Sequence, residues 1–176
     1  WAERYRSAEV ATGSPMLPAG SEHFGGFLAK LDFDQFDRLY DPTHGWAAHG
    51  SYFYAAGDGY DKADLDLRAA DNFGDYIVHG RIRGAGSFTG SLPFYDPVAL
   101  GGFLNLSGFA RNQIVGESLM YGNVRLEKIV GRLPAGLRGD MRVGLALEGG
   151  KVDGRYTETN LNGWQSSVTA YVGGET

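Results

Sequence analysis

Two histidines and a run of aspartates are the residues whose types and spacing come closest to metal-binding or catalytic chemistry. His44 and His49 are five positions apart with no glutamate between them, so the metalloprotease helix motif is absent. The acidic run comprises Asp58, Asp61, Asp64 and Asp66. Its spacing does not fit a calcium loop, and two of its members alternate along an expected strand. We therefore expect ordinary histidines and solvated or luminal carboxylates at these positions.

Nucleophiles and phosphate-binding loops are also poorly represented. The chain has no cysteine, which excludes a disulfide framework, a thiolate nucleophile and cysteine-ligated zinc. No Gly-x-Ser-x-Gly nucleophile elbow occurs. The stretch from Gly84 to Gly90 resembles a phosphate loop only loosely, because it lacks the spacing, the lysine and the following helix. We expect no catalytic constellation, no metal and no cofactor in this chain.

The composition describes one glycine-rich and mildly acidic domain spanning residues 1–176. A net charge of -5, without any cluster of basic residues, argues against nucleic acid as a partner. The 28 glycines and 13% aromatic residues favour a β-rich chain with many turns. No apolar run reaches the ~20 residues of a spanning helix. No signal peptide precedes Trp1, so we expect a fragment or a processed product.

Alternation of apolar and polar residues with period two is the strongest local signal. In one segment, Phe27, Leu31 and Phe33 fall on one face while Lys30 and Asp32 fall on the other. The expected strands lie near residues 1–10, 24–34, 46–56, 62–70, 75–88, 117–130, 138–152 and 164–176. Most of them are longer than soluble strands and suit a tilted crossing of a bilayer. We predict an all-β antiparallel meander of about eight strands, with a long loop at 89–116.

This alternation fits two architectures. A soluble barrel buries the apolar face and exposes the charged one, and here it would bind an apolar ligand inside eight strands. A membrane barrel turns the apolar face to lipid and fills its lumen with charge. Strand length and the aromatic residues near strand ends, such as Trp46, Tyr121 and Trp164, favour the membrane barrel. The pattern alone leaves both architectures open.

Two stretches carry a resemblance to a known family. The first runs from Leu31 to Asp37 and continues into a Pro-Thr-x-Gly turn formed by Pro42, Thr43 and Gly45. The second is the series Leu92–Asp96, Leu100–Gly102, Leu106–Phe109, Arg111 and Gly116. The two stretches resemble the bacterial surface-antigen barrel superfamily, whose long luminal loop carries a Val-Arg-Gly-Phe/Tyr motif. Their order and spacing look most like the C-terminal barrel of patatin-like phospholipase autotransporters, over essentially the whole chain.

The resemblance implies a bacterial outer-membrane location and a share in a barrel of about sixteen strands. Such a barrel belongs to type V protein secretion, where it anchors and also translocates an N-terminal patatin-like hydrolase that is absent from this chain. The implied partners are outer-membrane lipid, the remainder of the barrel, a periplasmic POTRA-type domain and the barrel-assembly machinery. An eight-strand piece also has two free edges, so we expect it to pair with its missing half, with another copy or with itself.

The resembling loop motif consists of Leu106, Ser107, Gly108, Phe109 and Arg111. In the superfamily a loop arginine at the position of Ser107 pairs with a strand carboxylate inside the lumen, and Glu148 is the matching carboxylate here. A hydroxyl cannot replace the bidentate grip of a guanidinium. We therefore hypothesise that Arg111 supplies the charge to Glu148, because a carboxylate kept from water needs a partner. The alternative is that Glu148 faces luminal water.

Overall fold

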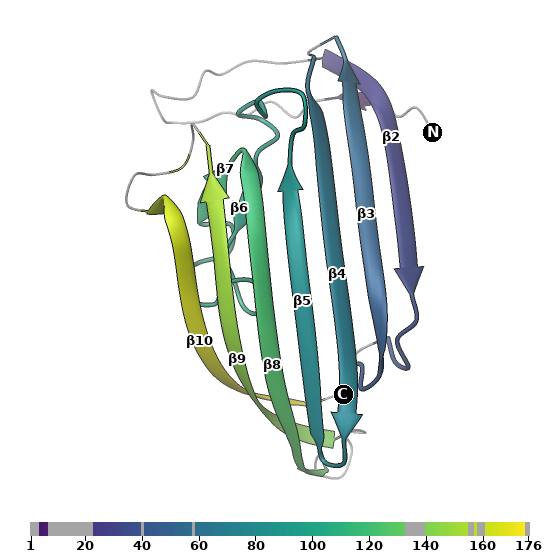
Figure 1. The fold of residues 1–176 in the computed structure, drawn as a ribbon, viewed down its shortest axis with the longest axis vertical. Helices are drawn as coiled ribbons and strands as arrows, with labels where there is room; N and C mark the ends of the chain where they lie inside the picture. The colour runs from purple at the N-terminus through teal and green to yellow at the C-terminus, as the bar shows by residue number, and fades with distance from the viewer. Residues whose placement is uncertain are drawn as a thin grey trace.

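The protein forms one long antiparallel sheet whose strands follow one another in sequence order. The computed structural model describes residues 4–6, 23–39, 41–57, 59–132, 140–154, 157 and 161–174. Eight strands pair in the order β1-β2-β3-β4-β5-β8-β9-β10 (Figure 1). Their bounds are Arg4–Arg6 (β1), His23–Asp34 (β2), Gly45–Ala56 (β3), Asp61–Phe73 (β4), Tyr76–Gly86 (β5), Ser118–Arg132 (β8), Asp140–Asp153 (β9) and Gly163–Gly174 (β10). The predicted all-β antiparallel meander is confirmed.

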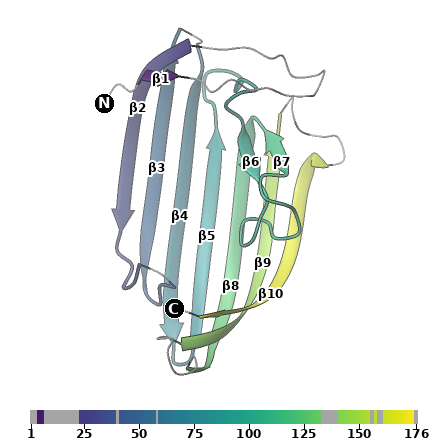
Figure 2. The same cartoon turned by 180° about the vertical axis from the view of Figure 1, so that it is seen from behind.

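The segment between β5 and β8 contains a small second sheet that the sequence pattern did not reveal. Val98–Leu100 (β6) pairs with Ile114–Gly116 (β7) inside the stretch predicted as a loop at 89–116. Each strand has only three residues, which is too short for a period-two pattern to emerge. Figure 2 shows this segment lying against one face of the large sheet, in front of β8 and β9. We call residues 87–117 the inner loop, and the face that it covers the inner face.

Successive side chains of a strand point to opposite faces, so each strand contributes one row to each face. The inner rows are polar and charged, as shown by Asp66 on β4, Glu127 on β8 and Glu148 on β9, all of which are buried. The outer rows are apolar and exposed. They include Phe27, Leu31, Trp46, Leu65, Ile82, Met120, Val124, Leu145, Leu147, Trp164, Val168 and Val172. The sheet therefore exposes its apolar face and covers its charged one.

The hydrophobic core lies between the inner loop and the end of the sheet where that loop emerges. Loop residues Leu92, Leu100, Leu106 and Ile114 are fully or almost fully buried there. The loop packs on residues near the ends of three strands, β3, β8 and β9: Ala55, Leu119, Tyr121 and Val152. The burial of these side chains from water stabilises the loop in place on the sheet.

The sheet curls around its inner face, and residues far apart in sequence contact one another across that face. The Arg142 guanidinium on β9 donates to the carbonyl oxygen of Asp41, in the β2–β3 turn, at 3.3 Å. Phe103 of the inner loop meets the ring of Tyr171 on β10, with centroids 5.5 Å apart. Among the described residues, pairing begins at β1 and ends at β10, and no pairing joins these two strands. Closure into a barrel therefore stays a prediction.

Within the described ranges, no helix is both long enough and apolar enough to cross a membrane.

Candidate functional site

The start of the inner loop is fixed by Asp61, the first residue of β4. Its carboxylate accepts hydrogen bonds from the Ser87 hydroxyl at 2.9 Å, the Phe88 amide at 3.2 Å and the Thr89 amide at 2.9 Å. The Thr89 hydroxyl is a fourth donor. Hydrogen bonds to a charged group are stronger than those between neutral groups, so this carboxylate holds the chain where it leaves β5.

A lysine holds the middle of the inner loop. The Lys62 ammonium on β4 lies 2.5 Å from the Asp96 carboxylate and 3.0 Å from the carbonyl oxygen of Pro97. The Tyr60 hydroxyl donates to the same Asp96 carboxylate at 3.2 Å. Sequence patterns could not single out this pair, because its members are 34 residues apart and only Asp96 belongs to a resembling stretch.

The tip of the inner loop, residues 101–113, is clamped by Glu148 on β9. One carboxylate oxygen accepts from the Leu106 amide at 3.0 Å and the Tyr121 hydroxyl at 2.7 Å. The other accepts from the Ser107 amide at 2.9 Å and the Ser167 hydroxyl at 2.9 Å. Three strands and the loop thus meet at one buried carboxylate, which we call the Glu148 clamp.

The backbone of the tip is strained where it enters the clamp. Leu104 and Leu106 have φ angles of 54° and 74°, in the left-handed region that a leucine rarely adopts. Such strain costs on the order of 1–2 kcal/mol per residue, so surrounding contacts must hold it. The Leu104 carbonyl oxygen lies 2.9 Å from the Tyr121 hydroxyl, whose single proton it shares with Glu148, and the Leu106 amide donates to Glu148. The conformation of the tip therefore depends on the clamp.

The structure brings most of the predicted loop motif together with Glu148 but corrects the predicted donor. Leu106 and Ser107 contact Glu148 through their backbone amides, while Phe109 packs on the hydrophobic core. Gly108 lies against Ser167, where an added Cβ would be 3.3 Å from the Ser167 Cβ. Arg111 is exposed, and the described ion pairs contain none between it and Glu148. The expected Arg111–Glu148 pair was wrong, because backbone amides and hydroxyls already satisfy that carboxylate.

The predicted turn motif forms a compact connection between β2 and β3. The Asp37 carboxylate accepts from the Thr43 hydroxyl at 2.5 Å, from the Thr43 amide at 2.8 Å and from the His44 amide at 3.0 Å. Burial raises the pKa of Asp37, but these hydrogen bonds outweigh it and lower the pKa to about 2. Pro42 borders an inner-face cavity, so the motif also shapes the inner face.

Gly45 in this turn is expected to tolerate no side chain. Its φ is +117°, and a Cβ would lie 2.2 Å from the Gln35 carbonyl oxygen. Gly45→Ala should lower the free energy of unfolding by at least about 1–2 kcal/mol, measured by urea titration. Gly80→Ala is the matched control, because a Cβ there meets no atom within 4 Å. A similar loss in both variants would contradict this account of the turn.

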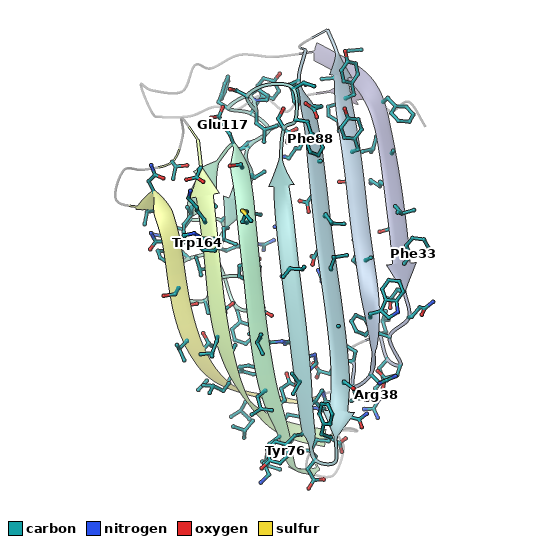
Figure 3. The ribbon with its side chains drawn as sticks, viewed as in Figure 1. Phe33, Arg38, Tyr76, Phe88, Glu117 and Trp164 are labelled. Carbon is teal, nitrogen blue, oxygen red and sulfur yellow. The ribbon has the colours of Figure 1, made fainter. Side chains whose placement is uncertain are left out.

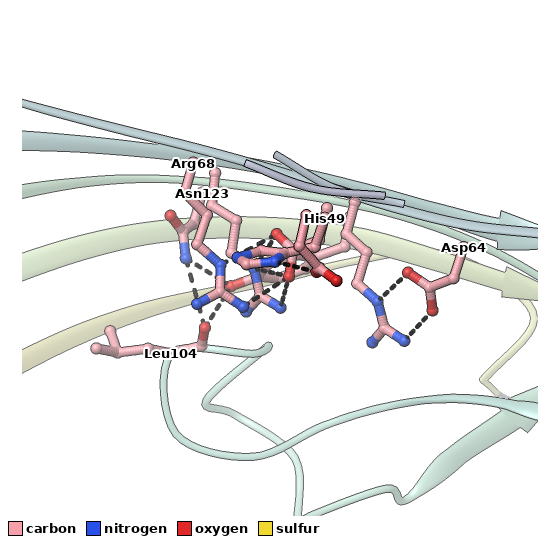
Figure 4. A network of polar contacts seen from close by, with 10 residues as sticks. His49, Asp64, Arg68, Leu104 and Asn123 are labelled. Carbon is pink, nitrogen blue, oxygen red and sulfur yellow. Dashed lines mark hydrogen bonds and ion pairs between the residues drawn. The ribbon is translucent and has the colours of Figure 1, made fainter. Parts of the chain in front are cut away.

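The aspartates and histidines that could have suggested a metal site are engaged in separate pairs. Asp64 binds Arg83, with oxygen and nitrogen 2.5 Å apart. Asp66 binds both Arg68 and Arg81, each at 2.7 Å (Figure 4). The His44 ring lies 2.9 Å from Asp71 and the His49 ring 2.8 Å from Asp32. Asp58 lies outside the described residues. Within the described part of the chain, no group of three or more acidic, histidine or cysteine side chains could hold a metal ion.

A second buried carboxylate, Glu127 on β8, lies close to several polar side chains of the inner face. It is near the end of the sheet that holds the β2–β3 and β4–β5 turns, which we call the turn end. It lies 2.5 Å from the Tyr171 hydroxyl, 3.3 Å from the Arg142 guanidinium and 3.3 Å from the His79 ring. This network was not predicted from the sequence. The signal that could have revealed it is the presence of charged residues on the same face of neighbouring strands, at positions that pair with one another.

No family model matches the sequence, and no curated protein matches it.

Proposed function

We propose that this chain is a segment of a bacterial outer-membrane β-barrel. The observation that supports the proposal is the direction of the two faces: the outer rows are apolar and exposed, while the inner rows are charged and covered. A soluble barrel that holds an apolar ligand would need the opposite arrangement. In a membrane barrel, lipid covers the apolar rows and the polar lumen contains the charged ones.

Charges on the outer face lie only near strand ends among the described residues. Asp71 and Lys128 lie toward the turn end of the sheet. Lys151 and Asp153 lie toward the opposite end, where the inner loop emerges. Aromatic side chains on the same face also lie near both strand ends, as Phe33, Tyr76, Phe88 and Trp164 illustrate (Figure 3). This arrangement fits an apolar band bounded by interfacial aromatic residues.

The height of the apolar band fits a bilayer. On β3 the exposed rings of Trp46 and Tyr54 face outward and are eight positions apart. At about 3.3 Å per residue they are roughly 26 Å apart along the strand. Outer-membrane barrels present an apolar band about 25 Å tall, and a strand tilt of about 35–45° would reduce the present separation to roughly 19–22 Å along the membrane normal, which is of the same order.

We further propose that the barrel anchors a patatin-like hydrolase and provides its route across the membrane. This part of the proposal rests on the resemblance of the loop and turn motifs. The edges of the sheet would pair with further strands of the same protein or with a second copy, because unpaired strand edges are costly in lipid. A POTRA-type domain and the barrel-assembly machinery would be its periplasmic and assembly partners.

Folding in the presence and absence of detergent micelles tests the membrane proposal. We expect β-type circular dichroism and a heat-sensitive gel band only in micelles, because only they cover the outer rows. The opposite result, a folded and monodisperse chain in plain buffer, would overturn it. The patatin part is tested separately by expressing the full-length gene and asking whether proteolysis of the barrel releases a lipid hydrolase from the cell surface.

A further inference from the structure

A cavity of about 320 Å³ lies on the inner face, between the β2–β3 turn, the sheet and the tip of the inner loop. Its apolar wall comes from Phe36 and Leu39 of the turn and from Phe103 of the loop. Its polar wall comes from the strands. This volume lies within the roughly 300–1,000 Å³ of small-molecule sites, and the mixture of apolar lining with a few polar groups is also typical of them.

The polar wall of the cavity has more positive than negative charge. Three guanidinium groups line it, those of Arg68, Arg81 and Arg125, against one carboxylate, that of Asp34. His49 and His79 line it too, and each lies beside a carboxylate, Asp32 and Glu127 respectively.

The two carboxylates behind this wall are shared and do not remove the excess. Asp66 serves both Arg68 and Arg81. Glu127 serves Arg142 at 3.3 Å and lies 3.7 Å from Arg125. With Asp34 of the cavity lining, three carboxylates thus face four guanidiniums, of which Arg142 is almost fully buried. The side chains of Arg81 and Arg125 are only 21% and 22% exposed, and an excess of partly buried positive charge favours a further anion in the cavity.

An unsatisfied acceptor belongs to Asn123, a residue that lines the same cavity. Asn123 is only 7% exposed, and its side-chain nitrogen donates to the Tyr121 hydroxyl at 2.8 Å and the Leu104 carbonyl at 3.4 Å. Its buried Oδ1 has no hydrogen-bond partner among the described atoms. A buried acceptor without a partner costs free energy, so an occupant that donates a hydrogen bond would be favoured there.

We propose that this cavity binds a small organic oxyanion, a phosphate ester or a carboxylate, that also carries a hydroxyl or N–H group. The oxyanion lies against the guanidiniums of Arg68, Arg81 and Arg125, which suit planar, bidentate contacts. The donor group reaches Asn123 Oδ1, and the carbon skeleton contacts Phe36 and Phe103. This inference goes beyond the membrane function and does not depend on it.

Three matched probes test the proposal on the folded chain, in micelles or in buffer according to where it folds. Glycerol 3-phosphate has both groups, propyl phosphate lacks the hydroxyls, and glycerol lacks the charge. Each is titrated at constant ionic strength while the arginine Nε–H signals are followed by NMR. We expect glycerol 3-phosphate to shift the Arg125 signal saturably, about five- to tenfold more tightly than propyl phosphate, as one added hydrogen bond implies. Glycerol alone should not shift it.

Variants assign the binding to this cavity. Arg125→Gln should weaken glycerol 3-phosphate binding about tenfold or more, now followed on the remaining arginine signals, because a charged hydrogen bond is lost. Arg125→Lys should recover part of the affinity. Arg111→Gln is the control, since it removes the same charge from an exposed loop position outside the cavity. If Arg125→Gln does not fold, Arg68→Gln replaces it, because Arg68 is the most exposed of the three, with 46% of its side chain accessible.

Two outcomes would overturn the proposal. Equal affinity for the two phosphates would remove the role of Asn123. Chemical shifts that rise linearly with ligand concentration would show general ionic association with the protein and no specific site. The same conclusion would follow if the Arg125 and Arg111 variants changed the shifts equally.

Discussion

Glu148→Gln is expected to release the tip of the inner loop from the sheet. The carboxylate accepts from two loop amides and two hydroxyls, whereas a glutamine has a single acceptor oxygen and would turn an NH₂ group toward donors. Breaking a buried, charged hydrogen-bond network costs about 3 kcal/mol or more. The left-handed leucines beside the clamp, Leu104 and Leu106, would then lose the contacts that hold them.

Hydrogen exchange at the Leu106 and Ser107 amides measures this release directly. These two amides donate to Glu148, so opening of the clamp exposes them to solvent. A loss of about 3 kcal/mol corresponds to exchange on the order of a hundredfold faster. The matched control is Arg111→Ala, which should leave both amides protected because Arg111 makes no described contact with Glu148. Slow exchange in Glu148→Gln, or fast exchange in Arg111→Ala, would contradict the clamp.

The strands could be predicted from sequence because their signal is local. Most of the long strands contain a run of alternating apolar and polar residues, and the rows that alternation assigns to one face do share a face in the structure. Which face is exposed and which is covered is not decided by local sequence. Period two says which residues lie together, but it does not say which of the two faces becomes the inside. That choice follows from where the inner loop packs.

The clamp shows where sequence reasoning stops. Glu148 could be identified as a carboxylate in need of a partner, but its donors include two backbone amides that every residue except proline possesses. The expected arginine pairing relied on side-chain chemistry alone. Similarly, the Lys62–Asp96 ion pair and the β6–β7 strand pairing depend on how the inner loop folds back onto the sheet. No residue type at a fixed spacing in the sequence predicts either contact.

Val124→Arg is expected to destabilise the chain strongly in a bilayer and hardly at all in water. Val124 lies near the middle of β8 on the outer face, and 57% of it is exposed. An arginine at the midplane of an outer-membrane barrel costs about 2–4 kcal/mol. The same change at an exposed site in water stays within about 0.5 kcal/mol. Urea unfolding of the chain in lipid vesicles distinguishes the two environments.

Ser118→Arg supplies the control for depth. Ser118 begins β8 on the same face and is exposed, but it lies at the end of the strand, level with Asp153. An arginine near the membrane interface costs only about 0–1 kcal/mol, so the membrane orientation requires a clear difference between the two variants. Equal effects at the two depths would mean that water covers the outer rows, since lipid penalises a charge according to its depth and water does not.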